Sequence, residues 1–448
     1  MLCKNQQIEL TIDGYASDGS GIGRDESGMA VFVAGAIKRE RVRVHLIKVN
    51  KTYAVGKLLE VLSPSNDRIT PTCPHTAKCG GCTFRHMSYE GECALKRQRV
   101  ADAFSRIGGF SLPVDEIVPS PLETGYRNKA MFPAGTVNDR KVFGFYSAHS
   151  HRVTEVNECR LLPQETLALR EKAEAWMNRF ALSVYDETTG NGLIRHLYIR
   201  RGFHSGETLV CLVVTDEAVP HTQELVDTLR TVDGVVSVVL NINRKPGNTV
   251  LGAKNILLWG RETITDTLCG RSFALSPHSF YQVNTCQAEA LYTIAGEKAG
   301  TGETLVDLYC GAGTIGLSLS DRFSRIIGVE IVPQAVENAK QNAMTNGVTN
   351  AHFLAGDAAA AAQTLADEGI TPDVVVLDPP RKGCDAPLLD TVAQMAPVRI
   401  VYVSCDPATC ARDCRILAEK GYALCSVTPV DLFPRTAHVE SVVLMSRA

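Results

Sequence analysis

The stretch Asp307-Leu-Tyr-Cys-Gly-Ala-Gly-Thr-Ile-Gly316 joins an apolar segment with strand character, ETLVDLY, to a segment compatible with a helix. Its glycines let the backbone approach a ligand closely, and the N-terminus of the following helix offers free backbone amides. From about residue 271 onward the same strand–helix alternation repeats. The further predicted strands are RIIGVE, AHFLAGD, DVVVLDPP and RIVYVSCD. This alternation predicts an α/β domain over residues 271–448, built on a doubly wound parallel sheet with right-handed crossovers.

The first 270 residues follow other patterns. Residues 1–62 contain short segments of alternating polarity separated by glycine-rich turns, which predicts a small OB-type β-barrel. Residues 67–270 combine helix-type and strand-type segments, which predicts a central mixed α/β domain. Between Lys38 and Lys57 there are seven Lys or Arg residues and a single acid, Glu40. This charge is typical of a phosphate-binding surface, although a solvated strand face has the same pattern.

The composition is that of a globular protein, with 45% hydrophobic and 21% charged residues. The N-terminal residues lack the apolar centre of a signal peptide, and no segment approaches the ~18 consecutive apolar residues of a membrane span. We therefore expect a cytoplasmic protein with no membrane partner. In such a protein, fifteen cysteines indicate metal binding, catalysis or packing rather than a disulfide framework.

Acidic residues stand at the ends of four predicted strands, and the carboxyl ends of parallel strands meet at one crevice. They are Asp307, Glu330, Asp357 and Asp378. Glu330 is placed to hold the hydroxyls of a ribose, and Asp357 to reach an adenine edge, which favours S-adenosylmethionine as the ligand. The three glycines of the loop also fit the dinucleotide pattern G-x-G-x-x-G. An NAD-dependent oxidoreductase with a structural zinc is therefore an alternative from a different class.

The segment RIVYVSCDP (399–407) predicts a buried strand that ends at Cys405, because the following proline cannot donate to a strand ladder. A pyrimidine C5 is a poor nucleophile, and addition of a thiolate at C6 activates it for methylation. Cys405 is our candidate nucleophile. Cys384, which follows the DPP motif of Asp378 by a few residues, is the rival expected for cytosine. Arg381 stands where amino-group methyltransferases often carry an aromatic residue, which favours methylation of carbon.

Carbon methylation also needs a base that removes the C5 proton. Glu440 interrupts an apolar strand near the C-terminus, AHVESVVLM. Burial there should raise its pKa toward neutrality, which suits proton removal. A structural ion pair with Arg435 would be the alternative role for Glu440, and His438 is the rival base.

Three cysteines, Cys73, Cys79 and Cys82, form a C-x5-C-x2-C pattern in which glycines allow the tight bends that wrap a metal centre. The spacing leaves the fourth ligand open between Cys93 and Cys159. It also leaves open whether the centre is zinc or an iron–sulfur cluster.

Taken together, the glycine loop, DPPRKG, SCDP and the cysteine pattern resemble the RNA uracil-5-methyltransferase family over essentially the whole chain. The chain is most similar to the branch that methylates 23S ribosomal RNA and carries an N-terminal TRAM domain and a [4Fe–4S] cluster. The resemblance implies Cys405 as nucleophile and Glu440 as base, and cluster ligation by Cys73, Cys79, Cys82 and Cys159. It also implies that residues 67–270 form an iron–sulfur and RNA-binding domain.

For the cofactor, the resemblance implies contacts from a larger set of residues: Gln282, Tyr309, Gly311, Thr314, Glu330, Asp357 and Asp378. Phe280 and Gln282, in the segment SFYQVN, would lie at the target base. The implied substrate is an unpaired or flipped uridine of large-subunit ribosomal RNA, methylated by a monomeric enzyme. A transfer RNA uracil-5-methyltransferase and a non-catalytic, cluster-bearing RNA-binding protein are the alternatives.

Overall fold

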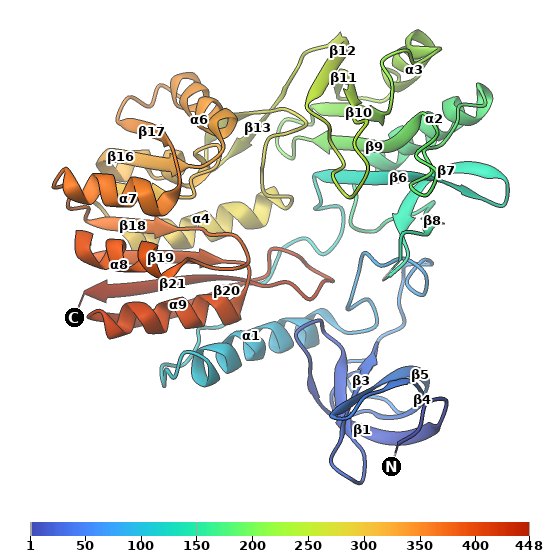
Figure 1. Ribbon diagram of the computed structural model, residues 1–448, viewed down its shortest axis with the longest axis horizontal. Coiled ribbons are helices and arrows are strands. Elements are labelled where there is room, and N and C mark those ends of the chain that lie inside the picture. The colour runs from blue at the N-terminus through green and yellow to red at the C-terminus, as the bar shows by residue number, and fades with distance from the viewer. Residues whose placement is uncertain (1, 149, 448) are drawn as a thin grey trace.

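The computed structural model describes residues 2–148 and 150–447, which form an N-terminal barrel, a central sheet and a C-terminal sheet (Figure 1). The five barrel strands close in the order β1-β2-β3-β5-β4. They are β1 (Gln7–Tyr15), β2 (Gly21–Arg24), β3 (Ala30–Ala34), β4 (Arg41–Val49) and β5 (Tyr53–Ser63). Alternate apolar side chains such as Val31, Val42 and Val44 fill the interior. The predicted N-terminal β-barrel is confirmed.

The strand register explains why the charge count overstated the free positive charge of the barrel. Glu9 of β1 lies opposite Arg43 of β4, and Arg43 lies opposite Glu60 of β5. Arg43 forms ion pairs with Glu9 at 2.9 Å and with Glu60 at 2.6 Å, and Arg41 pairs with Glu9 at 2.8 Å. Both acids lie outside the segment from Lys38 to Lys57, so neighbouring strands neutralise part of its charge.

The central body is a seven-stranded sheet in the order β12-β11-β10-β9-β6-β7-β8. Its strands are β6 (Lys129–Val137), β7 (Arg140–Tyr146), β8 (Val153–Glu155), β9 (Ile194–Arg201), β10 (Thr208–Val214), β11 (Val235–Ile242) and β12 (Lys254–Gly260). Only β10 and β11 are parallel; the other pairs are antiparallel. Helices α2 (Gln164–Arg179) and α3 (Thr222–Leu229) pack on this sheet through Leu169, Trp176 and Leu225.

The C-terminal body is a seven-stranded sheet in the order β17-β16-β15-β18-β19-β21-β20. Its strands are β15 (Gly302–Leu308), β16 (Phe323–Glu330), β17 (Ala351–Ala355), β18 (Val374–Leu377), β19 (Arg399–Ser404), β20 (Tyr422–Val430) and β21 (Glu440–Arg447). The five strands from β15 to β19 are parallel, as predicted. The other two differ, because β21 runs antiparallel to both β19 and β20.

Helices cover both faces of this sheet. They are α4 (Thr285–Ala299), α5 (Thr314–Ser318), α6 (Pro333–Thr345), α7 (Ala358–Asp367), α8 (Ala386–Met395) and α9 (Pro407–Glu419), with a 3₁₀ turn at Ser320–Arg322. Residues of α4, α5 and α6 pack with one set of inward-facing strand residues, and residues of α7, α8 and α9 pack with the other. The sheet is therefore doubly wound.

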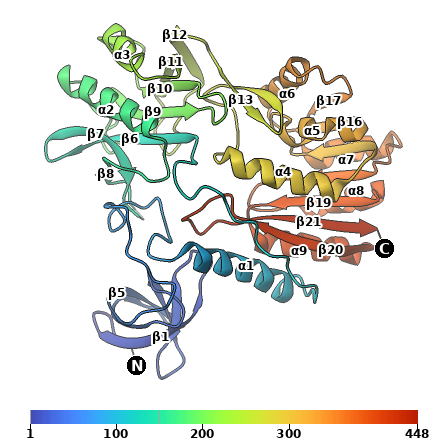
Figure 2. The ribbon, with the colours of Figure 1, turned by 180° about the vertical axis from the view of Figure 1, so that it is seen from behind.

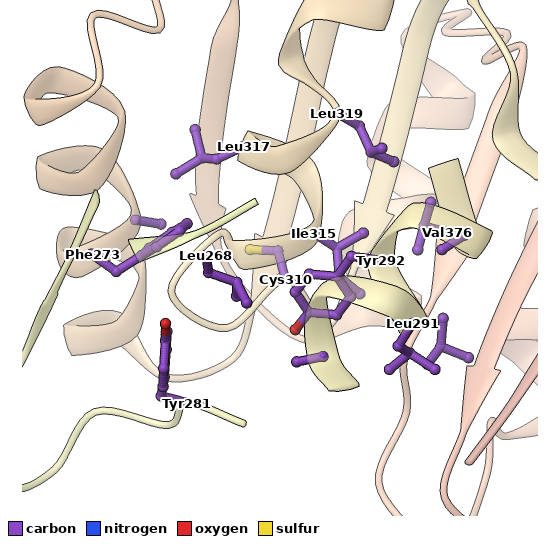
Figure 3. Close-up of a cluster of buried hydrophobic side chains, with 14 of the residues drawn as sticks. Leu268, Phe273, Tyr281, Leu291, Tyr292, Cys310, Ile315, Leu317, Leu319 and Val376 are labelled. Carbon is purple, nitrogen blue, oxygen red and sulfur yellow. The ribbon is translucent and has the colours of Figure 1, made fainter. Parts of the chain in front are cut away.

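Two elements cross the predicted domain boundary between residues 270 and 271. Helix α1 (Tyr89–Arg106) lies beside α9 and β20 (Figure 2), where Val100, Ala103 and Phe104 join the C-terminal core. The hairpin of β13 (Ile264–Leu268) and β14 (Arg271–Leu275) packs against α4, with Leu268 and Phe273 in the same apolar cluster as Leu291 (Figure 3). The chain thus contributes a helix from its N-terminal third to the C-terminal body.

Candidate active site

A cavity of about 2190 Å³ opens along the carboxyl ends of the parallel strands and extends to the central sheet. Its wall contains residues that follow β15, β16, β18 and β19, together with loops from the central sheet and the segment between β20 and β21. Ligands of doubly wound sheets bind at this edge. Every sequence-predicted site residue except Thr314 lines this cavity.

The glycine loop and Glu330 form one connected unit. One carboxylate oxygen of Glu330 accepts a hydrogen bond from the Gly311 amide at 3.1 Å, and the other accepts from Val332 at 2.9 Å. Tyr309 and Gly311 both have positive φ, of 71° and 56°, a region that residues other than glycine rarely adopt. The loop is therefore held in a tight bend, with Glu330 at the end of β16 facing the cavity.

Asp357 and Asp378 occupy the corresponding positions after β17 and β18. Asp357 is the N-cap of α7 and accepts hydrogen bonds from Ala359 and Ala360 at 3.0 and 3.2 Å, both through the same oxygen. The capping role and a ligand role are thus compatible, because the second oxygen is not used for capping. Loss of hydration raises the pKa of Asp378 to about 7.

Thr314 is the exception among the predicted cofactor contacts. It begins α5 directly after Gly313, and its hydroxyl lies 3.1 Å from the hydroxyl of Tyr292 on α4. The first turn of the helix therefore directs this side chain toward the packed interior, and Thr314 does not line the cavity.

Cys405 is half-buried at the point where β19 ends and α9 begins. Asp406 caps α9 through the amides of Ala408 and Thr409, which leaves Cys405 immediately before the N-terminus of this helix. Burial and the nearby carboxylate of Glu440 raise the pKa of Cys405 to about 11, and Arg381 opposes this shift. The thiol of the free protein is therefore not pre-ionised, in contrast to the assistance that the sequence led us to expect.

Glu440 is the first residue of β21 and is only 5% exposed. Burial and the nearby Asp378 raise its pKa to about 8, and Arg381 opposes this shift. Within residues 2–148 and 150–447 no ion pair involves Glu440. Arg435, the partner considered from the sequence, instead pairs with Glu92 and Glu123. The carboxylate therefore faces the cavity without a cation bound to it.

The two rival residues occupy different environments. His438 lines the cavity, where burial and Arg381 lower its pKa, and the Arg381 guanidinium lies 3.3 Å from its ring. Cys384 is 5% exposed and does not line the cavity. The hydroxyl of Tyr402 lies 3.7 Å from its sulfur and also donates to Asp413 at 2.7 Å, which places Cys384 in the packed interior.

Phe280 and Gln282 lie in the loop between β14 and α4, on the opposite side of the cavity from the sheet edge. The backbone carbonyl of Gln282 accepts a hydrogen bond from Asn128 at 2.8 Å, so the central body helps to hold this loop. The Phe280 side chain is 67% exposed although it is aromatic. An exposed aromatic ring at the mouth of a cavity is suited to stacking against a planar ligand.

The four predicted cluster cysteines line another part of the same cavity. Burial raises the pKa of each of Cys79, Cys82 and Cys159, and their mutual charges contribute to these shifts. Cys93, the other candidate for the fourth position, is instead buried in α1 beside Tyr89 and Asp431. In the described part of the chain, no three Cys, His, Asp or Glu side chains are arranged to hold a metal ion.

Cationic residues from separate segments also line the cavity, and they were not predicted as site residues from the sequence. Arg85, Arg99 and Arg127 come from the segment before the central sheet, and Arg381 follows the DPP motif. Each stands alone in its own stretch, so no local charge run identifies them. The fold gathers them into one basic wall, which is the charge that an RNA backbone requires.

Comparison with known proteins identifies the family. A family model described as "tRNA (Uracil-5-)-methyltransferase" matches residues 252–448, and a TRAM domain model matches residues 2–59. An uncharacterized RNA methyltransferase of Clostridium tetani is 43% identical over 99% of this chain and 97% of its own length. Another from Clostridium acetobutylicum is 42% identical over 99% and 98%. This chain belongs to the RNA uracil-5-methyltransferase family.

A solved member of similar architecture is the Pyrococcus abyssi tRNA (uracil-54, C5)-methyltransferase in complex with S-adenosyl-L-homocysteine. It is 26% identical to this chain, with a TM-score of 0.80, and the match covers 98% of this chain and 99% of that one. The chain is thus an S-adenosylmethionine-dependent RNA methyltransferase, and the NAD-dependent oxidoreductase alternative is wrong. Among the described residues, no helix is long and apolar enough to cross a membrane.

Proposed function

We propose that this RNA uracil-5-methyltransferase methylates C5 of a uridine in 23S ribosomal RNA, with Cys405 as nucleophile and Glu440 as base. The observation that carries the assignment is the strand register. Ser404 and Ser441 are paired across β19 and β21, so Cys405 and Glu440 follow at the same end of the ladder and face one cavity. A thiol and a carboxylate in this arrangement can act on adjacent atoms of one pyrimidine ring.

The reaction needs three bond changes at the base. The Cys405 thiolate adds to C6, and the electron pair of the C5–C6 double bond moves toward C5 and the C4 carbonyl. Bound S-adenosylmethionine supplies the methyl group to C5 and leaves as the neutral thioether. The Glu440 carboxylate then removes the C5 proton, and the returning electron pair restores the double bond and expels the Cys405 thiolate.

The two acid–base groups fit these roles through their environments. At neutral pH a large fraction of Glu440 is protonated, because burial raises its pKa to about 8, so the proton it receives from C5 is held stably. Arg381 lowers the pKa of both Cys405 and Glu440 and therefore favours the charged form of each. We assign Arg381 the task of stabilising the thiolate before it adds to C6.

We assign cofactor binding to residues of the sheet edge. Glu330 is suited to the ribose hydroxyls, Asp357 to the adenine edge, and Asp378 with Gln282 to the amino-acid portion. Tyr309 and Gly311 would approach the ligand through the bend of the loop. Phe280 would stack on the target base or its neighbour.

We also propose that Cys73, Cys79, Cys82 and Cys159 ligate a [4Fe–4S] cluster. Four thiols that share a cavity wall but are too dispersed for a single ion suit a cluster, because its irons extend over a larger volume than one ion. Arg85 supports this fit. It is 6% exposed, it lowers the pKa of Cys82, and its Nε has no hydrogen-bond partner among the described residues. A buried cation of this kind suits an anionic thiolate centre.

The choice of ribosomal RNA rests on the combination of an N-terminal barrel with a four-thiol site, which the resemblance associates with the ribosomal branch. Transfer RNA is the second candidate. The Pyrococcus abyssi structure of a tRNA methyltransferase matches this chain along nearly its whole length. The barrel alone therefore does not distinguish the two substrates.

Methylation of unmodified transcripts tests the proposal. Purified protein would be incubated with S-adenosylmethionine carrying a tritiated methyl group and with separate 23S ribosomal RNA and transfer RNA transcripts. We expect label in 5-methyluridine of the ribosomal transcript. Label only in transfer RNA would overturn the substrate, and label in 5-methylcytidine would overturn the base. Cys405→Ala protein provides the matched control for the nucleophile.

A further inference from the structure

The segment Asp431–Val439 between β20 and β21 leads directly to Glu440, and its fastening to the rest of the molecule is unusual. Its contacts come largely from a distant part of the chain, residues 83–126, which precedes the central sheet. We refer to Asp431–Val439 as the base loop. Four of its residues line the cavity: Phe433, Thr436, Ala437 and His438. The position of Glu440 therefore depends on how this loop is held.

A buried ionic cluster holds the start of the base loop. The Lys96 ammonium donates to Asp431 at 2.7 Å, to Glu92 at 2.6 Å and to the Phe433 carbonyl at 3.1 Å. The side chains of Lys96, Glu92 and Asp431 are completely buried. Tyr89 adds a hydrogen bond to the second oxygen of Asp431 at 2.8 Å. Buried charges of this kind are costly unless they are paired, so they hold one geometry.

The middle of the base loop is held at Arg435. Its amide donates to Glu92 at 2.7 Å, and its carbonyl accepts from Thr83 at 2.8 Å and Phe84 at 3.1 Å, the two residues that follow Cys82. Its guanidinium donates to the Met87 carbonyl at 2.8 Å and pairs with Glu123. Arg435 also has a φ of 71°. A non-glycine residue in this region persists only where surrounding contacts hold it, and such residues concentrate at functional sites.

Two further hydrogen bonds hold the remaining carbonyls. The Tyr126 hydroxyl donates to the Pro434 carbonyl at 2.9 Å, and Arg99 donates to the Ala437 carbonyl at 2.5 Å. Contacts from residues 83–126 thus reach the loop at Asp431, Phe433, Pro434, Arg435 and Ala437. Glu440 follows three residues after the last of these, and its own carboxylate has no ion pair in the described residues. Nothing in direct contact by charge holds the base, so its loop must.

We propose that Lys96 and Arg435 are positioning residues for proton removal by Glu440, acting through the base loop. This inference rests on the proposed role of Glu440. The consequence concerns one step of the reaction. Disturbing the loop should slow removal of the C5 proton while leaving Cys405, which ends β19 on a different strand, able to add to C6. The methylated protein–RNA adduct should then accumulate during turnover on ordinary uridine RNA.

The test measures this adduct as a denaturation-resistant protein–RNA band, together with kcat, KM for RNA and binding of S-adenosylhomocysteine. For Lys96→Met we expect kcat to fall about tenfold, KM to change little, and the adduct fraction to rise about tenfold. Because this change leaves Asp431 and Glu92 buried without their cation, the variant can fail to fold. Tyr126→Phe and Tyr89→Phe each remove hydroxyl contacts to the loop without unpairing a charge, and we expect a smaller rise of the adduct in both. Arg435→Lys should restore part of the kcat that Arg435→Met loses.

Arg106→Ala is the matched control, because Arg106 lies on the same helix, is exposed, and pairs only with Asp102. It should leave all four quantities unchanged. If the folded variants lose kcat without accumulating adduct, the residues support the fold alone and the inference is wrong. Glu440→Gln separates this failure from failure of the proposed function. If Glu440→Gln itself shows no adduct, Glu440 is not the base, whatever the loop variants do.

Discussion

Ser404 of β19 and Ser441 of β21 are directly paired in an antiparallel ladder, so the next opposed positions are Cys405 and Glu440. One strand thus ends with the thiol where its neighbour begins with the carboxylate. Both strands are buried and sit inside a seven-stranded sheet, which limits their relative movement. The groups proposed to act on C6 and C5 of a pyrimidine are therefore positioned by backbone pairing rather than by flexible loops alone.

Replacing Cys405 by alanine should abolish methylation, because C5 is then never activated. Binding of S-adenosylhomocysteine should change by less than about threefold, since the proposed cofactor contacts come from other strands. Calorimetric titration and transfer of a tritiated methyl group measure the two properties. Cys425→Ser, at an exposed cysteine of β20, is the control and should retain full activity. Methylation by the alanine variant would disprove the assignment of the nucleophile.

Replacing Glu440 by glutamine should block release of the C5 hydrogen. With RNA labelled with tritium at C5 of uridine, the normal enzyme should release tritium to water as it methylates. The variant should release it about 10²–10⁴-fold more slowly, the range typical for loss of a general base. Equal release rates would exclude Glu440. His438→Ala tests the rival base in the same assay and should retain most of the release rate.

Burial of Glu440 should also make the stability of the protein depend on pH. Its folded pKa of about 8 lies above the ordinary value of 4.5, because burial and Asp378 disfavour the charged form. The stabilising contribution of the protonated form is complete below about pH 4.5 and is lost as the pH rises through about 8. Glu440→Gln removes this loss and should raise the free energy of unfolding at pH 9 by about 2–4 kcal/mol relative to the normal protein.

Thermal unfolding at pH 5 and pH 9 measures the difference between Glu440→Gln and the normal protein. The two should have similar melting temperatures at pH 5, and the variant should melt higher at pH 9. Glu419→Gln, on the C-terminal turn of α9, is a surface control and should show no such crossover. A constant difference at both pH values would mean that Glu440 is not charged unfavourably in the folded protein.

Local sequence patterns were sufficient for the strand–helix order of the C-terminal body, because apolar β-branched segments alternate with helical ones there. They also placed Cys405 and Glu440 at strand ends. They did not predict that β21 inserts antiparallel between β19 and β20, because strand order depends on tertiary packing. Yet this insertion is what brings Glu440 beside Cys405. The site residues were thus predicted one by one, whereas their relationship required the fold.

Other differences have the same origin. Thr314 lies in the glycine motif, but the turn of α5 directs it toward Tyr292 and away from the cavity. Helix α1 follows the cysteine pattern in sequence, but its apolar face packs on the C-terminal body. The acids that neutralise Arg43 come from neighbouring strands, which a count along the sequence does not include.

The cysteine site makes a prediction about metal content. Anaerobically purified protein should contain about four irons and four sulfides per chain and absorb visible light, if the four thiols ligate the proposed cluster. Cys82→Ser should lose the iron and the absorbance. Cys93→Ser is the matched control, because Cys93 lies in α1 outside the four-thiol set, and it should retain both. A colourless protein that contains zinc would exclude the cluster and favour a different use of the same thiols.

The barrel makes a prediction about RNA affinity that separates its paired cations from its free ones. Lys48 and Lys51 are exposed and form no ion pair within the described residues, whereas Arg41 is already paired with Glu9. If the barrel binds phosphates, Lys48→Glu with Lys51→Glu should weaken binding of ribosomal RNA about tenfold and reduce its salt dependence by one to two contacts. Arg41→Gln should have a smaller effect, because Glu9 already neutralises that charge. Binding measured across a series of salt concentrations distinguishes the two variants, and unchanged affinity in the double variant would show that this side of the barrel does not contact the RNA backbone.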